Sequence, residues 1–259
     1  MESYGVKQTE TWFFLRGLVR ESGHWSGFLE AFEARFPERR VVALDLPGNG
    51  TRYHEASPVS IEAMARALRE AAAPFRGDKN YLFAISLGAM VGLEWMHQAP
   101  DDFAGAVLVN TSLRGLSPLH HRLRPANYPA ILRAMRAKDF ETRERIILAL
   151  TSQDPNNVDR WAKPWAEIQS RHPVSVRNAL RQLLAAIRFA PPKTKPRPPL
   201  LILNSAKDTL VDPLASQRLS AHWNAPLRVN PRSGHDLTLD DPEWVLEQLE
   251  SFGAGIVRG

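Results

Sequence analysis

The segment 80–95, NYLFAISLGAMVGLEW, decides the fold. Residues 81–85 form an apolar run of strand character, and the residues after Ser86 take helical spacing. Ser86 lies between two small residues, Ala84 and Gly88, at minus two and plus two. Small residues there let a strand and a helix close on each other around a sharp turn that pushes the serine hydroxyl clear of the sheet. The segment therefore predicts a serine beside a helix N-terminus, where backbone N–H groups favour negative charge.

This pattern resembles the nucleophile elbow of the α/β-hydrolase family, usually written G-x-S-x-G. Ala84 stands in place of the first glycine and keeps that position small. The pentapeptide alone fits an ordinary helix-capping serine equally well. The resemblance nevertheless extends over roughly residues 12–252, because two further segments match the family in the expected order.

Apolar runs of strand character recur along the chain and alternate with helical patterns. The runs lie at 11–15, 40–44, 81–85, 105–109, 200–204 and 227–230, and the helical patterns at 27–36, 60–73, 214–223 and 242–252. Continuous apolar strands separated by helices are typical of a parallel sheet covered on both faces. We therefore expect an α/β fold with a doubly wound, mainly parallel sheet.

The alternation of strands and helices stops between residues 113 and 190. Helical patterns occur there at 128–137, 140–150 and 174–189, without a convincing strand. A proline-rich stretch, 191–199, then reads as a stiff extended linker. In the α/β-hydrolase family a cap or lid sits at this point. We therefore expect a core domain formed by residues 1–112 and 199–259, with residues 113–198 inserted as a helical cap.

Three chemically related residues each follow a strand-like run: Ser86, Asp208 and His235. A serine hydroxyl needs a base within reach, and that base needs a third group to fix its tautomer. Serine, carboxylate and histidine follow in this order on the α/β-hydrolase fold. The resemblance implies Ser86 as nucleophile, His235 as base and Asp208 as its partner. Asp212 is the alternative carboxylate, less favoured because it lies further from the strand end.

The loop after the first strand reads Arg16-Gly17-Leu18, where relatives usually have H-G-x. The resemblance implies that the backbone N–H groups of Leu18 and Leu87 form an oxyanion hole. Arg16, Gly17 and Trp25 are candidate substrate contacts. Two interpretations of Arg16 remain open: it pairs with a neighbouring carboxylate such as Asp45, or it binds an anionic group of the substrate.

Composition narrows the remaining function classes. The chain has no cysteine and no HExxH zinc pattern, so we expect neither a metal nor another cofactor. Its N-terminus has no basic region followed by an apolar stretch, so we expect a cytoplasmic protein. No apolar run has the length of a membrane span. Residues 113–198 carry 17 Lys and Arg against 6 Asp and Glu, while the rest of the chain is mildly acidic. No nucleic-acid-binding motif accompanies this basic segment.

The sequence thus predicts a serine hydrolase that cleaves a small-molecule carboxylic ester. The alternatives are a thioesterase, or an esterase for methyl esters of acyl chains on an acyl carrier protein. In these cases the substrate is anionic or is held by an acidic carrier that the basic segment recruits. A further alternative is a non-catalytic relative that binds an acidic protein through the same segment.

Overall fold

A computed structural model describes residues 10–257, with side chains described to residue 253. The expectation that the N-terminus carries no signal peptide concerns mostly residues 1–9, which lie outside the described residues. Within them, six parallel strands form one sheet in the order β2-β1-β3-β4-β5-β6. The strands are β1 (Glu10–Leu15), β2 (Arg39–Leu44), β3 (Lys79–Ile85), β4 (Gly105–Val109), β5 (Leu200–Ser205) and β6 (Leu227–Asn230). The expected doubly wound parallel sheet is confirmed.

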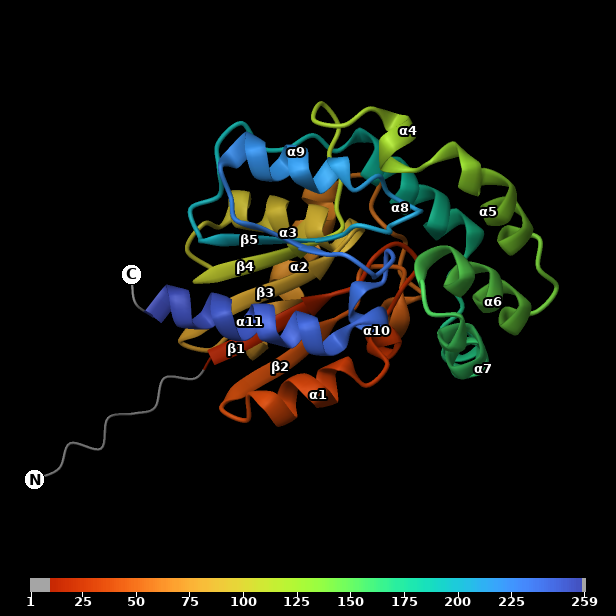
Figure 1. Ribbon diagram of the computed structural model, residues 1–259, viewed down its shortest axis with the longest axis horizontal. Helices are drawn as coiled ribbons and strands as arrows, with labels where there is room; N and C mark the ends of the chain where they lie inside the picture. The colour runs from red at the N-terminus through yellow and green to blue at the C-terminus, as the bar shows by residue number, and fades with distance from the viewer. Residues whose placement is uncertain (1–9, 258–259) are drawn as a thin grey trace, which may run out of the picture.

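Helices cover both faces of this sheet (Figure 1). One face packs on α1 (Phe28–Arg35) and α11 (Pro242–Val257), and the other on α2 (Ile61–Ala72), α3 (Leu87–Gln98) and α9 (Leu214–Trp223). Successive strand residues alternate between the two layers: Trp12 and Phe14 join the first, Phe13 and Leu15 the second. Because both faces are buried, the strands consist of continuous apolar residues.

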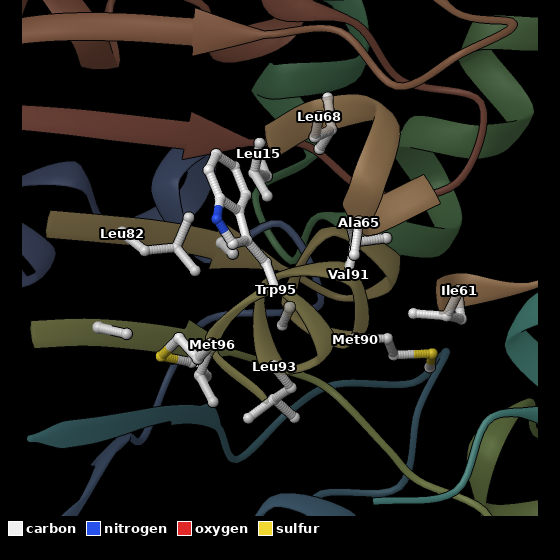
Figure 2. Packing of buried hydrophobic residues seen from close by; sticks show 14 of the residues in the cluster. Leu15, Ile61, Ala65, Leu68, Leu82, Met90, Val91, Leu93, Trp95 and Met96 are labelled. Atoms are coloured by element: carbon white, nitrogen blue, oxygen red, sulfur yellow. The ribbon is translucent and has the colours of Figure 1, made fainter. Parts of the chain in front are cut away.

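Helix α3 lies unusually close to the sheet. A Cβ atom on Gly88 would lie 2.6 Å from the carbonyl oxygen of Arg16, and one on Gly92 would lie 2.3 Å from Cδ2 of Leu82. Position 88 therefore requires glycine, because backbone atoms occupy the space, whereas a larger residue at position 92 would require the Leu82 side chain to move. Figure 2 shows Leu15 and Leu82 from the strands beside Trp95 of α3, within the same apolar layer. This close packing fixes the start of α3, and with it the position of Ser86.

Five helices occupy the chain between β4 and β5, and Figure 1 shows them grouped at one side of the molecule. We call α4 to α8 the helical insertion. It consists of α4 (Leu119–Arg122), α5 (Tyr128–Met135), α6 (Phe140–Thr151), α7 (Pro155–Arg171) and α8 (Val176–Arg188). Within it Leu148, Ala162 and Trp165 form a small separate core. Helix α7 was not expected, because residues 155–171 fall between the helical patterns identified in the sequence.

A 3₁₀ turn and a short α-helix lie next to the loops at the carboxyl ends of the strands. The 3₁₀ turn Ser22–Trp25 follows the loop after β1, and α10 (Leu237–Asp240) follows His235 and Asp236. Three further 3₁₀ turns lie at Gly50–Arg52, Ala73–Phe75 and Pro125–Asn127. Ser60 caps the start of α2, since its hydroxyl accepts a hydrogen bond from the backbone N–H of Ala63 at 3.3 Å.

Candidate active site

Ser86 occupies the sharp turn between β3 and α3. Its backbone φ is 56°, in the left-handed region that non-glycine residues rarely adopt, and it is the residue immediately before α3. The backbone N–H of Ser86 donates to the carbonyl of Val109 at 2.9 Å, and the Thr111 hydroxyl donates to the carbonyl of Ser86 at 2.9 Å. Contacts to the end of β4 therefore hold the strained turn in place.

His235 and Asp208 lie against each other. Nδ1 of His235 is 2.7 Å from Oδ2 of Asp208, and both residues are buried, at 7% and 1% exposure. The other Asp208 oxygen accepts the backbone N–H groups of Leu210 and Val211 at 2.8 and 2.9 Å. Asp208 is thus fixed by its own turn, with one oxygen aimed at the imidazole. This arrangement leaves Nε2 of His235 as the ring nitrogen not engaged by the carboxylate.

Asp212, the alternative carboxylate, lies elsewhere. Its Oδ1 accepts the backbone N–H of Leu214 at the start of α9, and its Oδ2 is 3.6 Å from Nδ1 of His121. The two aspartates of the segment therefore have separate contacts, and the structure brings Asp208, rather than Asp212, to His235.

The electrostatics around His235 favour its protonated form. Burial disfavours the imidazolium, but the adjacent Asp208 carboxylate outweighs burial, and the pKa of His235 is raised above its ordinary value. A histidine in this state holds a proton more readily than a free imidazole and, when neutral, is a stronger base.

Two adjacent residues after β4 position both halves of the site. The Asn110 amide donates to the carbonyl of His235 at 2.9 Å, while Thr111 holds Ser86 as described. Asn110 also accepts the backbone N–H of Ser205, at the end of β5, at 2.9 Å. The Ser86 hydroxyl itself has no hydrogen-bond partner within residues 10–257, and catalytic hydrogen bonds often tighten only when substrate binds. Sequence reasoning missed Asn110 and Thr111; their place directly after a buried strand was the available signal.

The loop after β1 passes directly over Ser86. A Cβ atom on Gly17 would lie 3.3 Å from Cβ and 3.8 Å from Oγ of Ser86, so glycine there allows the close approach of the backbone. Leu18 follows Gly17 in this loop, and Leu87 begins α3, whose first N–H groups lack partners within the helix. Leu18 and Leu87 thus flank the serine from two different elements.

Arg16 pairs with Asp236, and the suggested partner Asp45 is wrong. The guanidinium contacts both carboxylate oxygens of Asp236 at 3.0 and 2.5 Å, with both side chains buried. The Asp45 carboxylate instead accepts the backbone N–H groups of Ser22 and Thr51. Burial opposes ionisation of Asp236, but Arg16 outweighs it and lowers the pKa of this carboxyl.

Trp25 belongs to the apolar core beneath Arg16. Its ring is 3% exposed and packs against Phe14, Phe28 and Phe83, while the Arg16 guanidinium lies 4.8 Å from the ring centre. The sequence suggested Arg16 and Trp25 as substrate contacts. Both side chains instead contact other residues of this chain. Through Asp236, Arg16 holds the segment that carries His235.

A family model described as the alpha/beta hydrolase family matches residues 12–248. The chain therefore belongs to the alpha/beta hydrolase family. A search of curated proteins returned no match. Within residues 10–257, no helix combines the length and the apolar character that crossing a membrane requires.

Solved structures share the fold over nearly the whole chain. A putative non-heme bromoperoxidase from Mycobacterium tuberculosis is 20% identical, with a TM-score of 0.72 over 96% of this chain and 94% of its own. A putative aryl esterase from Burkholderia cenocepacia is 22% identical, with a TM-score of 0.72 over 98% and 92%. A thermophilic esterase from Thermogutta terrifontis is 18% identical, with a TM-score of 0.70 over 96% and 92%. At these identities the likeness concerns the fold.

Proposed function

We propose that this protein is a serine hydrolase that cleaves carboxylic esters, with Ser86 as nucleophile, His235 as base and Asp208 as the orienting carboxylate. The observation that carries the proposal is the buried 2.7 Å contact between His235 and Asp208, together with a serine held at positive φ in the turn after β3. A carboxylate on Nδ1 fixes the tautomer in which Nε2 is the proton acceptor. The contacts of Asn110 and Thr111 support this arrangement from one side of the site.

The proposed reaction proceeds by acyl transfer. Ser86 Oγ forms a bond to the ester carbonyl carbon as its proton passes to Nε2 of His235. The backbone N–H groups of Leu18 and Leu87 stabilise the negative charge that develops on the carbonyl oxygen. The alcohol leaves with the proton from His235. Water then attacks the acyl group, gives a proton to His235, and releases the carboxylic acid as the hydroxyl of Ser86 is restored.

The helical insertion is the proposed cap over this chemistry. Among the arginines of the insertion, Arg133, Arg136 and Arg177 are exposed and make no ion pair within residues 10–257. By contrast Arg145 pairs with Glu141 and Asp159, and Arg181 donates to the carbonyl of Ser57. The unpaired arginines favour the second candidate function, hydrolysis of an acyl ester or thioester presented by an acidic carrier protein.

The proposal is tested by initial hydrolysis rates on a panel of p-nitrophenyl esters and matched thioesters of increasing acyl length. We expect turnover by the wild-type protein and a loss on the order of 10⁴-fold in kcat for Ser86→Ala. Ser170→Ala is the matched control, because Ser170 is exposed on α7 and bonds only to the Glu167 carbonyl of its own helix. Equal rates for the two variants would contradict the assignment of Ser86.

A further inference from the structure

Helices α5 and α8 leave apolar side chains uncovered on both sides of a groove. Tyr128, Leu132 and Met135, spaced for one face of α5, are 45%, 44% and 47% exposed. Leu184 and Ile187 of α8 are each 37% exposed. Of these residues, Tyr128, Leu132, Met135 and Ile187 line one and the same cavity.

The groove holds an apolar cavity of about 410 Å³, a volume within the range of small-molecule pockets. Its walls come from α5 and α8, and its floor includes Met90, one turn into α3, and Ser112, two residues after Asn110. The cavity therefore extends from the surface of the insertion towards the part of the core that carries Ser86.

A second cavity of about 380 Å³ adjoins the first, since Leu119, Arg122 and Ile187 line both. Its other walls come from the turn 114–118, which brings Arg114 and Ser117 to the space. The second cavity is also partly apolar, through Leu116, Leu119 and Ile187, but it differs from the first in that Arg114 and Ser117 line it together with Arg122.

Arg122, at the junction, is a buried cation without a counter-ion. Its side chain is 9% exposed, and it donates to the backbone carbonyls of Ala186 and Ile187 near the end of α8. It makes no ion pair within residues 10–257, and its Nε has no hydrogen-bond partner there. Burial, reinforced by the neighbouring charge of Arg114, lowers the pKa of Arg122 to about 10. A buried charge that is not paired costs considerable free energy, which a bound anion would offset.

Ser117 adds a second unused donor. It is buried, its hydroxyl has no hydrogen-bond partner in the described part of the chain, and it lines the second cavity with Arg122. Arg114 is exposed at the same cavity and contributes a second positive charge. Two guanidinium groups and a free hydroxyl around one space match the acceptor-rich head of a carboxylate or phosphate.

We propose that the two adjoining cavities bind an amphiphilic anion: its apolar chain lies between α5 and α8, and its carboxylate or phosphate head contacts Arg122, Ser117 and Arg114. This binding site goes beyond the proposed hydrolysis and does not depend on Ser86 being a nucleophile. The competing explanation is that Arg122 only caps the C-terminal carbonyls of α8. That role requires neither Ser117 nor Arg114, so these two residues separate the explanations.

The test is calorimetric titration of the full chain with decanoate, decyl phosphate, decanol and decyltrimethylammonium, each below its micelle concentration. We expect decanoate or decyl phosphate to bind about tenfold or more tightly than decanol, because a hydrogen bond to a charged group stabilises more than a neutral one. The tighter of the two anions identifies the head group. The ammonium amphiphile should bind most weakly.

Ser117→Ala and Arg114→Gln should each weaken binding of the preferred anion several-fold and leave the binding of decanol and the thermal midpoint unchanged. Arg66→Gln is the matched control: Arg66 is exposed on α2, makes no ion pair among the described residues, and its loss changes the net charge equally. Binding of decanol as tight as that of both anions, wild-type affinity in both site variants, or no binding of any probe would each overturn the proposal.

Discussion

The two aspartates of the segment 205–213 illustrate how a single residue defines the site. Asp208 is nearly inaccessible and contacts His235, whereas Asp212 caps the start of α9. The two side chains are chemically identical and only four positions apart. Their surroundings alone assign them different roles.

Replacing each aspartate by asparagine is therefore informative. Asp208→Asn should leave a folded protein with kcat lowered by roughly 10⁴-fold, because the imidazole loses the carboxylate that sets its tautomer. Asp212→Asn should change kcat little. Steady-state kinetics with a p-nitrophenyl ester and a circular dichroism spectrum of each variant provide the measurement. The reverse ranking of the two variants would place the orienting role on Asp212.

His235 should make the activity depend on pH. In the proposed mechanism only neutral His235 accepts the proton of Ser86, and Asp208 raises the pKa of His235 above its ordinary value. The value of kcat/KM for an uncharged ester should therefore be high at alkaline pH and fall, as pH decreases, through a pKa above about 6.5. A profile whose acidic limb lies below that value would contradict the raised pKa.

At the scale of elements, the pair of Arg16 and Asp236 joins the loop after β1 to the residue before α10. Arg16→Met leaves the buried Asp236 carboxylate without its partner, and we expect a loss of about 3–5 kcal/mol in the free energy of unfolding. Urea denaturation measures this loss. The control is Arg35→Met, which removes exposed pairs with Glu243 and Glu250 and should change stability little.

A double variant distinguishes lost charge compensation from a general packing defect. Arg16→Met with Asp236→Leu removes both charges and should recover much of the stability lost by Arg16→Met alone. A double variant that is less stable than Arg16→Met alone would contradict charge compensation and would indicate a packing defect.

Strands and the turn at Ser86 could be predicted from the sequence, because each is specified by a few residues that are close together in the chain. The strands are short apolar runs, and the elbow is recognisable because Ala84 and Gly88 are small. Helix α7 was missed, and it contains two prolines: Pro155 begins the helix, where proline is favoured, and Pro164 lies inside it. Pairing of Arg16 with Asp236 joins residues 220 positions apart. No local pattern specifies such a contact, so the choice of Asp45 was wrong.

At the scale of the whole molecule, charge is divided between the insertion and the core. If the exposed arginines of the insertion recruit an acidic carrier, kcat/KM for a carrier-linked acyl ester should fall steeply with salt, since the Debye length is about 10 Å at 0.1 M. Arg133→Glu with Arg136→Glu should lower it further. A small neutral ester should respond to neither change. Similar responses of the two substrates would make these arginines a solvated surface.

Covalent labelling distinguishes Ser86 from every other candidate nucleophile of the chain. The wild-type protein is treated with a fluorophosphonate, digested, and analysed by peptide mass spectrometry. We expect one adduct, on the peptide that contains Ser86, with labelling greatly slowed in His235→Ala and absent at this peptide in Ser86→Ala. An adduct on another residue, or labelling of Ser86→Ala at the wild-type rate, would contradict the account.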